Sequence, residues 1–204
     1  MPAILVSPLL FLVAFLIGSI PFAVIVSKLM GLGDPRSYGS GNPGATNVLR
    51  SGNKLAALLT LLGDAIKGTF VVAFAVAVHM PAHMVAGMAL AVFLGHVFSV
   101  FLRFKGGKGV ATAAGVLLGL DWRLGCATLA VWIVVAAVTR YSSLAAICAA
   151  LAAPVLTYFF IGHNVMPGAV LTMSLVLIWR HTSNIKKLLA GQEGRIGQKK
   201  ADQA

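Results

Sequence analysis

The stretch MVAGMALAVFLGHVFSVFLRFKGGKGVATAAGVLLGL, residues 84–120, places a basic, glycine-rich segment between two apolar runs. The apolar runs are continuous and lack the alternation of polar and apolar residues that is typical of barrel strands. Each run is bounded by charged residues and glycines rather than interrupted by them. The stretch therefore predicts two membrane helices that are joined by a polar loop.

The same pattern recurs along the whole chain. Hydrophobic residues make up 59% of the 204 residues and charged residues only 10%, a balance that one soluble core could not bury. We therefore predict an all-α integral membrane protein with seven transmembrane helices. A span needs about 20 residues, so the fourth and seventh windows are short. The predicted windows are 4–30, 54–78, 82–102, 108–120, 122–138, 144–161 and 168–180.

The positions of the basic residues predict the orientation. Most of the 16 Lys and Arg residues fall in loops that share one side of the membrane, and the positive-inside rule assigns that side to the cytoplasm. The N-terminus is then outside and the C-terminus inside. We expect residues 4–30 to stay as a helix rather than to be a cleaved signal peptide, because they are too long. Residues 1–185 form the predicted membrane domain, and 186–204 form a basic cytoplasmic tail.

The net charge of +11 does not indicate a nucleic-acid partner, because the basic residues lie between apolar segments and form no aromatic-interleaved surface. Cys126 and Cys148 stand singly inside apolar runs, so we predict core residues and neither a disulfide nor a metal site. Asp64 and Lys67 lie three residues apart inside the second window. They are expected to pair with each other or to face a polar interior.

The first polar loop, GSGNPGATNVLR at residues 39–50, has the composition of an oxyanion site. Its glycines allow backbone N–H groups to turn toward one point, and Ser40, Thr46, Asn47 and Arg50 add side-chain donors. The alternative is a plain connecting loop whose arginine reaches the membrane interface. The loop lacks the GxxxxGK[ST] spacing of a nucleotide triphosphatase.

The second polar loop, LRFKGGKGVAT at residues 102–112, combines glycines and Lys108 with the predicted start of a helix. A helix N-terminus carries partial positive charge, so this loop favours a phosphate site over a simple positive-inside anchor. Two further inner segments add polar groups. TRYSS offers Ser142 and Ser143, and RHTSNIKK places His181 and Asn184 on one face of a helix.

The sequence lacks the motifs that usually activate an acyl acceptor or hold a catalytic metal. It has no HExxH set, no GxSxG elbow and no HxxxxD pair. We therefore predict no metal and no cofactor. Two anion sites without a protein base or nucleophile indicate a donor that is already activated.

Six motifs, in this order and at these distances, resemble the bacterial acyl-phosphate glycerol-3-phosphate acyltransferase family, PlsY. The resemblance covers nearly the whole chain and touches every predicted inner loop. Ser99 departs from it, because the family usually has proline there, and we expect the end of the third helix to be looser. The motifs are GSIPFAVIVSKL, SGNPGATNVLR, LGDAIKG, GHVFSVFLRFKGGKGVAT, RYSSL and RHTSNIKKLLAGQE.

The resemblance implies a seven-helix enzyme of the bacterial inner membrane, with a periplasmic N-terminus and an active site that faces the cytoplasm. It implies transfer of a fatty acyl group from acyl phosphate to the 1-hydroxyl of sn-glycerol 3-phosphate, which gives lysophosphatidic acid and phosphate as the first step of phospholipid synthesis. The expected partners are these two substrates and the lipid bilayer, with no obligate protein partner.

Carried over by motif, the predicted catalytic residues are Ser40, Arg50, Lys108, His181 and Asn184. The predicted phosphate-binding residues are Gly41, Asn42, Gly44, Thr46, Asn47, Gly106, Gly107, Gly109, Ser142 and Ser143, and the motif does not fix which of the two serines is used.

Acyl phosphate is a mixed anhydride with a good leaving group, so we predict direct attack by the glycerol hydroxyl without an acyl-enzyme. The departing phosphate or His181 would accept the proton. The alternative functions are a small membrane transporter of phosphate or an organic phosphate, and a structural membrane subunit. A transporter favours polar groups at both faces or at the midplane, whereas here they gather at the predicted inner face.

Overall fold

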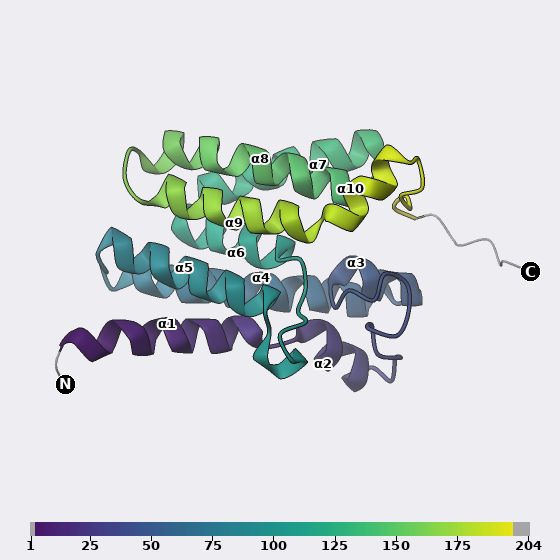
Figure 1. The fold of residues 1–204 in the computed structure, drawn as a ribbon, viewed down its shortest axis with the longest axis horizontal. Helices are drawn as coiled ribbons and strands as arrows, with labels where there is room; N and C mark the ends of the chain where they lie inside the picture. Colours follow the sequence, from purple (N-terminus) through teal and green to yellow (C-terminus); the bar gives the residue numbers. More distant parts are fainter. Residues whose placement is uncertain (1–2, 198–204) are drawn as a thin grey trace, which may run out of the picture.

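The computed structural model describes residues 3–197, with side chains described for residues 7–197. Every regular element in this part of the chain is helical, so the predicted all-α class is confirmed. Figure 1 shows long helices lying roughly side by side, from α1 and α2 at one edge to α7 and α8 at the other. The α-helices are α1 (Ala3–Ser19), α2 (Phe22–Leu29), α3 (Ala45–Val48), α4 (Lys54–Ala77), α5 (Ala82–Val97), α6 (Val110–Leu120), α7 (Trp122–Thr139), α8 (Ser142–Ile161), α9 (Met166–Arg180) and α10 (Thr182–Leu189), with 3₁₀ turns η1 (Leu49–Ser51) and η2 (Val100–Leu102).

Length and composition support four membrane spans among the described residues. These are α4, α5 extended through η2, α7 and α8, and the bent pair α1 and α2 makes a fifth if it is one span. Helices α6 and α9 are apolar but have only 11 and 15 residues. The predicted membrane protein is thus supported, while the seven spans and the orientation stay predictions.

The first apolar window is two helices rather than the single helix predicted for 4–30. Helices α1 and α2 meet at an angle of 41°. The break lies at Pro21, which has no N–H to continue the ladder and disfavours helical geometry at Ile20. The Nζ atom of Lys67 donates to the Ile20 carbonyl (2.9 Å), so a charge from α4 binds the backbone at the break.

Small residues let α4 and α6 pack closely. A Cβ on Gly68 would collide with the Thr112 carbonyl, and one on Gly115 would collide with the Ala65 carbonyl. Close approach of this kind is typical of helices that associate in membranes, where packing replaces the hydrophobic effect as the driving force. The α4–α6 contact places the start of α6 firmly against the rest of the bundle.

Two sequence predictions outside the polar loops need correction. Cys126 is exposed on α7 and Cys148 is half-buried on α8, so Cys126 is not a core residue. The sequence could not distinguish a buried cysteine from one on the outer face of a helix, because a helix in lipid is apolar on its outer face as well. Ser99 does not loosen the end of α5. It is buried, and its hydroxyl donates to the Ser19 carbonyl (2.5 Å), which ties α5 to α1.

Candidate active site

A polar cavity of about 420 Å³ lies where three segments distant in the sequence meet. In Figure 1, α3 and α10 lie at the same end of the bundle. The predicted residues Ser40, Gly41, Asn42, Gly106, Lys108 and Asn184 all line this cavity. The structure therefore brings the first two polar loops and the RHTSN segment together. The other lining residues are Pro43, Phe104, Lys105, Arg180, Ser183 and Lys187.

Lys108 is the central cation of the cavity. Its Nζ donates to Oδ1 of Asn184, which lies in the first turn of α10. Burial lowers the pKa of Lys108 to about 8, the Glu193 carboxylate opposes this shift, and repulsion from Arg50, Arg180 and Lys187 adds to it. The ammonium group is therefore partly desolvated and has few competing anions, which suits it to bind a phosphate.

Glu193 is a site residue that the sequence interpretation missed. Its Oε1 accepts hydrogen bonds from Ser143 Oγ (2.6 Å) and Asn184 Nδ2 (2.7 Å), so one carboxylate joins two predicted site residues. The sequence prediction places it in the basic tail, residues 186–204. The available signal was its rarity, because the chain has only five acidic residues and this one lies in an otherwise basic segment.

The segment after α10 folds back over the site. Ile196 N donates to the Arg140 carbonyl (2.7 Å), and Arg140 Nη2 donates to the Ile196 carbonyl (3.0 Å). The predicted boundary at 185/186 falls inside α10. Residues 198–204 of the predicted tail lie outside the described residues.

Arg180 was also not predicted as a site residue. Its Nη2 donates to the Gly106 carbonyl (3.0 Å), which holds the end of α9 against the second polar loop. Its Nε is buried and has no hydrogen-bond partner among the described residues. Buried polar groups are normally paired, so this donor is an exception that sets Arg180 apart.

The prediction that Asn47 donates to phosphate is wrong. Asn47 shapes the first loop instead. Both protons of its amide are used, because Nδ2 donates to the carbonyls of Pro35 (2.6 Å) and Tyr38 (3.2 Å). Its Oδ1 accepts from the Ser40 backbone N–H (2.9 Å) and lies 3.5 Å from Arg50 Nη1. Asn47 therefore positions Ser40 and Arg50, the two predicted catalytic residues of this loop.

The glycines of the second loop also act differently from the prediction. The N–H groups of Gly106 and Gly107 do not face a ligand, because they donate to the carbonyls of Val97 and His96 (3.1 Å each). A Cβ on either residue would collide with the end of α5. Gly109 has φ +88°, a left-handed conformation that ends the loop and delays the start of α6 to Val110. These glycines fix the loop against α5 and leave Lys108 to face the cavity.

His181 lies behind the cavity wall, 3% exposed, between α9 and α10. Burial lowers its pKa to about 4, so the ring is neutral near pH 7. Its Nδ1 lies 2.8 Å from the Leu177 carbonyl, and a neutral ring can make this bond only by donating from Nδ1. The free lone pair is then on Nε2.

The remaining predicted residues lie beside the cavity rather than in its wall. Thr46 Oγ1 and Ser142 Oγ are 3.4 Å apart and join the first loop to the start of α8. Gly44 precedes α3 as its N-cap. Among the described residues, no group of three or more His, Cys, Asp or Glu side chains could hold a metal ion.

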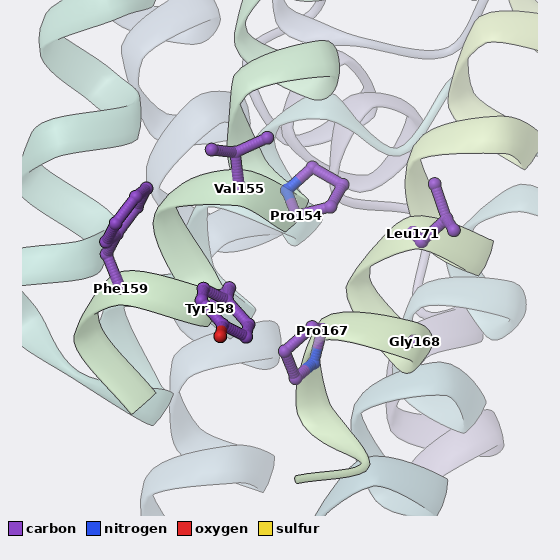
Figure 2. Close-up of a pocket in the computed structure, with 7 residues that line it drawn as sticks. All are labelled: Pro154, Val155, Tyr158, Phe159, Pro167, Gly168 and Leu171. Carbon is purple, nitrogen blue, oxygen red and sulfur yellow. The ribbon is translucent and has the colours of Figure 1, made fainter. Parts of the chain in front are cut away.

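A second cavity, of about 460 Å³, lacks the charged side chains of the polar cavity. Figure 2 shows it between α8 and α9, and the phenol of Tyr158 is the one polar side-chain group among its lining residues. It lies near the end of α8 and the start of α9, whereas the polar cavity lies where α9 ends. Its lining residues are Pro154, Val155, Tyr158, Phe159, Pro167, Gly168 and Leu171.

Comparisons with known proteins agree on one family. The family model for glycerol-3-phosphate acyltransferase matches residues 8–191. The glycerol-3-phosphate acyltransferase of Paraburkholderia phymatum is 62% identical over 198 residues, which cover 94% of this chain and 93% of the relative. That of Burkholderia cenocepacia is 62% identical over 192 residues, covering 93% and 90% of the two chains.

Two solved structures have the same fold. Both are of PlsY, an integral membrane glycerol 3-phosphate acyltransferase. The glycerol 3-phosphate form has a TM-score of 0.88 at 37% identity and covers 94% of this chain and 96% of that chain. The lysophosphatidic acid form has a TM-score of 0.86 at 36% identity and covers 94% and 95%. These matches favour the acyltransferase over the transporter and the structural subunit, and the chain belongs to the glycerol-3-phosphate acyltransferase family, PlsY.

Proposed function

We propose that this enzyme transfers a fatty acyl group from acyl phosphate to the 1-hydroxyl of sn-glycerol 3-phosphate, and releases lysophosphatidic acid and inorganic phosphate. The observation that carries the proposal is one cavity lined by Lys105, Lys108, Arg180 and Lys187, at one end of an apolar helix bundle. Several cations in a partly desolvated cavity suit two phosphate groups. The related solved structures hold glycerol 3-phosphate and lysophosphatidic acid, a substrate and a product of this reaction.

The acyl donor is proposed to be acyl phosphate because the site offers positioning and positive charge rather than a nucleophile. Among the described residues, the hydroxyls of Ser142 and Ser143 are hydrogen-bonded to Thr46 and Glu193, and no serine hydroxyl is hydrogen-bonded to a histidine. An activated serine needs such a base within hydrogen-bond reach. A mixed anhydride does not require an acyl-enzyme, since its phosphate is already a good leaving group.

In the proposed step the glycerol oxygen attacks the acyl carbonyl carbon, the new ester C–O bond forms, and the C–O bond to phosphate breaks. Lys108 and Arg180 stabilise the phosphate charge as it departs. The hydroxyl proton goes to the departing phosphate. The departing phosphate is preferred to His181 as the proton acceptor. Burial lowers the pKa of His181 to about 4, whereas a phosphate has a second pKa of about 6.

We further propose that α6 and α9 complete a set of seven spans, with the N-terminus in the periplasm and the cavity open to the cytoplasm. The short helices suit a locally thin or tilted arrangement. The acyl tail would lie among the apolar helices and the lipid of the bacterial inner membrane. The protein is expected to act without a partner protein.

The test is an assay of the purified protein in detergent with radiolabelled glycerol 3-phosphate. Palmitoyl phosphate is expected to give lysophosphatidic acid, whereas palmitoyl-CoA and palmitoyl-acyl-carrier protein in parallel reactions are expected to give none. Absence of product from all three donors, with a folded protein, would refute the function. Product from a thioester donor alone would refute acyl phosphate, and an acyl-serine trapped on Ser40, Ser142 or Ser143 and seen by mass spectrometry would refute direct transfer.

The pKa of Lys108 predicts an alkaline limit to activity. Below about pH 8 the side chain is charged, and above it the ammonium loses its proton. We expect kcat/KM for glycerol 3-phosphate to fall by about tenfold for each pH unit above this value, since kcat/KM reports the free enzyme. The Lys108→Arg variant should move the limit to higher pH, because arginine stays charged. A wild-type profile that is flat to about pH 9.5 would contradict this assignment.

A further inference from the structure

Three ionisable side chains lie buried together inside the helix bundle, away from the cavity. Asp64 and Lys67 on α4 are 2% and 4% exposed, and His96 near the end of α5 is 8% exposed. Of the two expectations for Asp64 and Lys67, a mutual pair or a polar interior, the pair is confirmed, with a distance of 2.8 Å from Lys67 Nζ to Asp64 Oδ1. None of the three lines the polar cavity. Burying charge within a membrane protein is costly, so such groups usually have a role. The contacts of these three side chains indicate what that role is.

Lys67 joins three helices through its ammonium group. Its Nζ donates to the Ile20 carbonyl at the α1–α2 break (2.9 Å) and to Asp64 Oδ1 (2.8 Å), and it lies 2.9 Å from His96 Nδ1. The same Nδ1 atom lies 3.4 Å from Asp64 Oδ1. The three side chains therefore form one connected polar cluster between α4, α5 and the α1–α2 break.

His96 holds the near side of the loop that carries Lys108. Its carbonyl accepts the Gly107 N–H (3.1 Å). Its ring lies directly against Gly107, since a Cβ there would collide with the ring atom Nε2. The next carbonyl, that of Val97, accepts the Gly106 N–H (3.1 Å). The position of His96 thus fixes the two residues that precede Lys108.

Asp64 holds the far side of the same loop. Its carbonyl accepts a hydrogen bond from Thr112 Oγ1 (3.0 Å), in the first turn of α6. Lys108 therefore lies between two anchors, Gly107 and Thr112, and each anchor rests on one member of the buried cluster. Both anchors are bonds to backbone carbonyls, and Lys67 links the side chains of the same two residues, so its loss would remove the connection that sets the two anchors relative to each other.

We propose that Asp64, Lys67 and His96 are positioning residues that hold Lys108 at its place in the cavity wall. The inference rests on the proposed function, because it concerns the cation that binds the substrate phosphate. The cluster acts through the backbone of residues 106–112 and touches neither substrate. Its effect is on where the Lys108 ammonium lies and on how much water reaches it.

The test variant is the double replacement Asp64→Asn with Lys67→Met, which removes both charges together, because a single replacement would leave one buried charge unpaired. The matched control is Asp121→Asn with Arg123→Met, a solvent-accessible pair at the start of α7, where asparagine can still cap the helix. A second variant, His96→Asn, keeps an acceptor for Lys67 and removes the ring from Gly107.

We expect the cluster double variant to lose at least about tenfold in kcat/KM for glycerol 3-phosphate, while the control pair stays near wild type. The alkaline limit should rise from about pH 8, because a displaced Lys108 is better hydrated and its pKa returns toward 10.5. His96→Asn should shift the limit in the same direction by less. A merely structural role would lower the amount of active protein and leave the pH profile unchanged.

Hydrogen exchange by mass spectrometry provides a readout that does not depend on activity. The amides of residues 106–112 are expected to exchange faster in the cluster variant than in wild type or the control pair. Unchanged exchange and an unchanged alkaline limit in folded variants would overturn the inference. If the wild type makes no lysophosphatidic acid, the proposed function fails, whereas the exchange result still decides whether the cluster supports this loop.

Discussion

Replacing Lys108 with alanine is expected to lower kcat by about 10²- to 10³-fold, the usual loss when one preorganised charge donor is removed from a reacting site. Lys108 is the partly buried cation of the polar cavity, and its Nζ donates to Asn184. Because its loop is held by backbone bonds of Gly106 and Gly107, the substitution removes the charge without removing those anchors. Steady-state kinetics with palmitoyl phosphate and glycerol 3-phosphate measure the loss.

The control for this substitution is Lys28→Ala, at an exposed lysine in the last turn of α2 that does not line the cavity. It removes one lysine charge and is expected to leave turnover near wild type. Both variants should keep the thermal unfolding midpoint and the elution volume of the wild type in detergent. Near-normal turnover in folded Lys108→Ala protein would remove Lys108 from the proposed mechanism.

Glu193→Ala is expected to cost about tenfold to hundredfold in kcat/KM, the range for losing hydrogen bonds to a charged group. Its Oε1 holds Ser143 and Asn184, and Asn184 in turn accepts from Lys108. The loss also acts through charge. The Glu193 carboxylate raises the pKa of Lys108, so its removal should lower that pKa below about 8 and bring the alkaline limit to lower pH.

Glu193→Gln separates the geometric effect from the electrostatic one. Glutamine keeps an oxygen acceptor for Ser143 and Asn184 but carries no charge, so its alkaline limit should move as in the alanine variant while activity near pH 7 is better retained. Rate profiles of the two variants from about pH 6 to 9 provide the comparison. Equal losses in both variants with an unmoved limit would show that Glu193 does not act on Lys108.

Much of the site could be predicted from the sequence because its signals are local. Lys108 follows two glycines at the start of a helix, and Asn184 lies just beyond the last apolar helix. Both line the cavity. The rarity of polar groups in this chain made such segments conspicuous, and a polar loop between membrane helices is a natural place for a binding site.

Other parts could not be predicted, because they depend on neighbours far along the chain. The sequence predicts Asn47 as a phosphate donor, but its two amide protons are donated to the carbonyls of Pro35 and Tyr38. The sequence predicts Glu193 as part of a tail. In the structure the chain turns back, and Glu193 accepts a hydrogen bond from Ser143, which lies 50 residues earlier. Whether a donor is free depends on which acceptors the fold brings to it.

The sequence by itself determined that this chain folds as helices in a membrane, because the length and polarity of each segment decide whether it can leave water. It also indicated which loops hold the polar chemistry. Only the tertiary structure decided that the first apolar window breaks at Pro21, that Lys67 joins the break to His96, and that Lys108 is partly desolvated. The physical reason is that hydrogen-bond satisfaction and desolvation are properties of a three-dimensional neighbourhood, whereas hydrophobic length is a property of the segment alone.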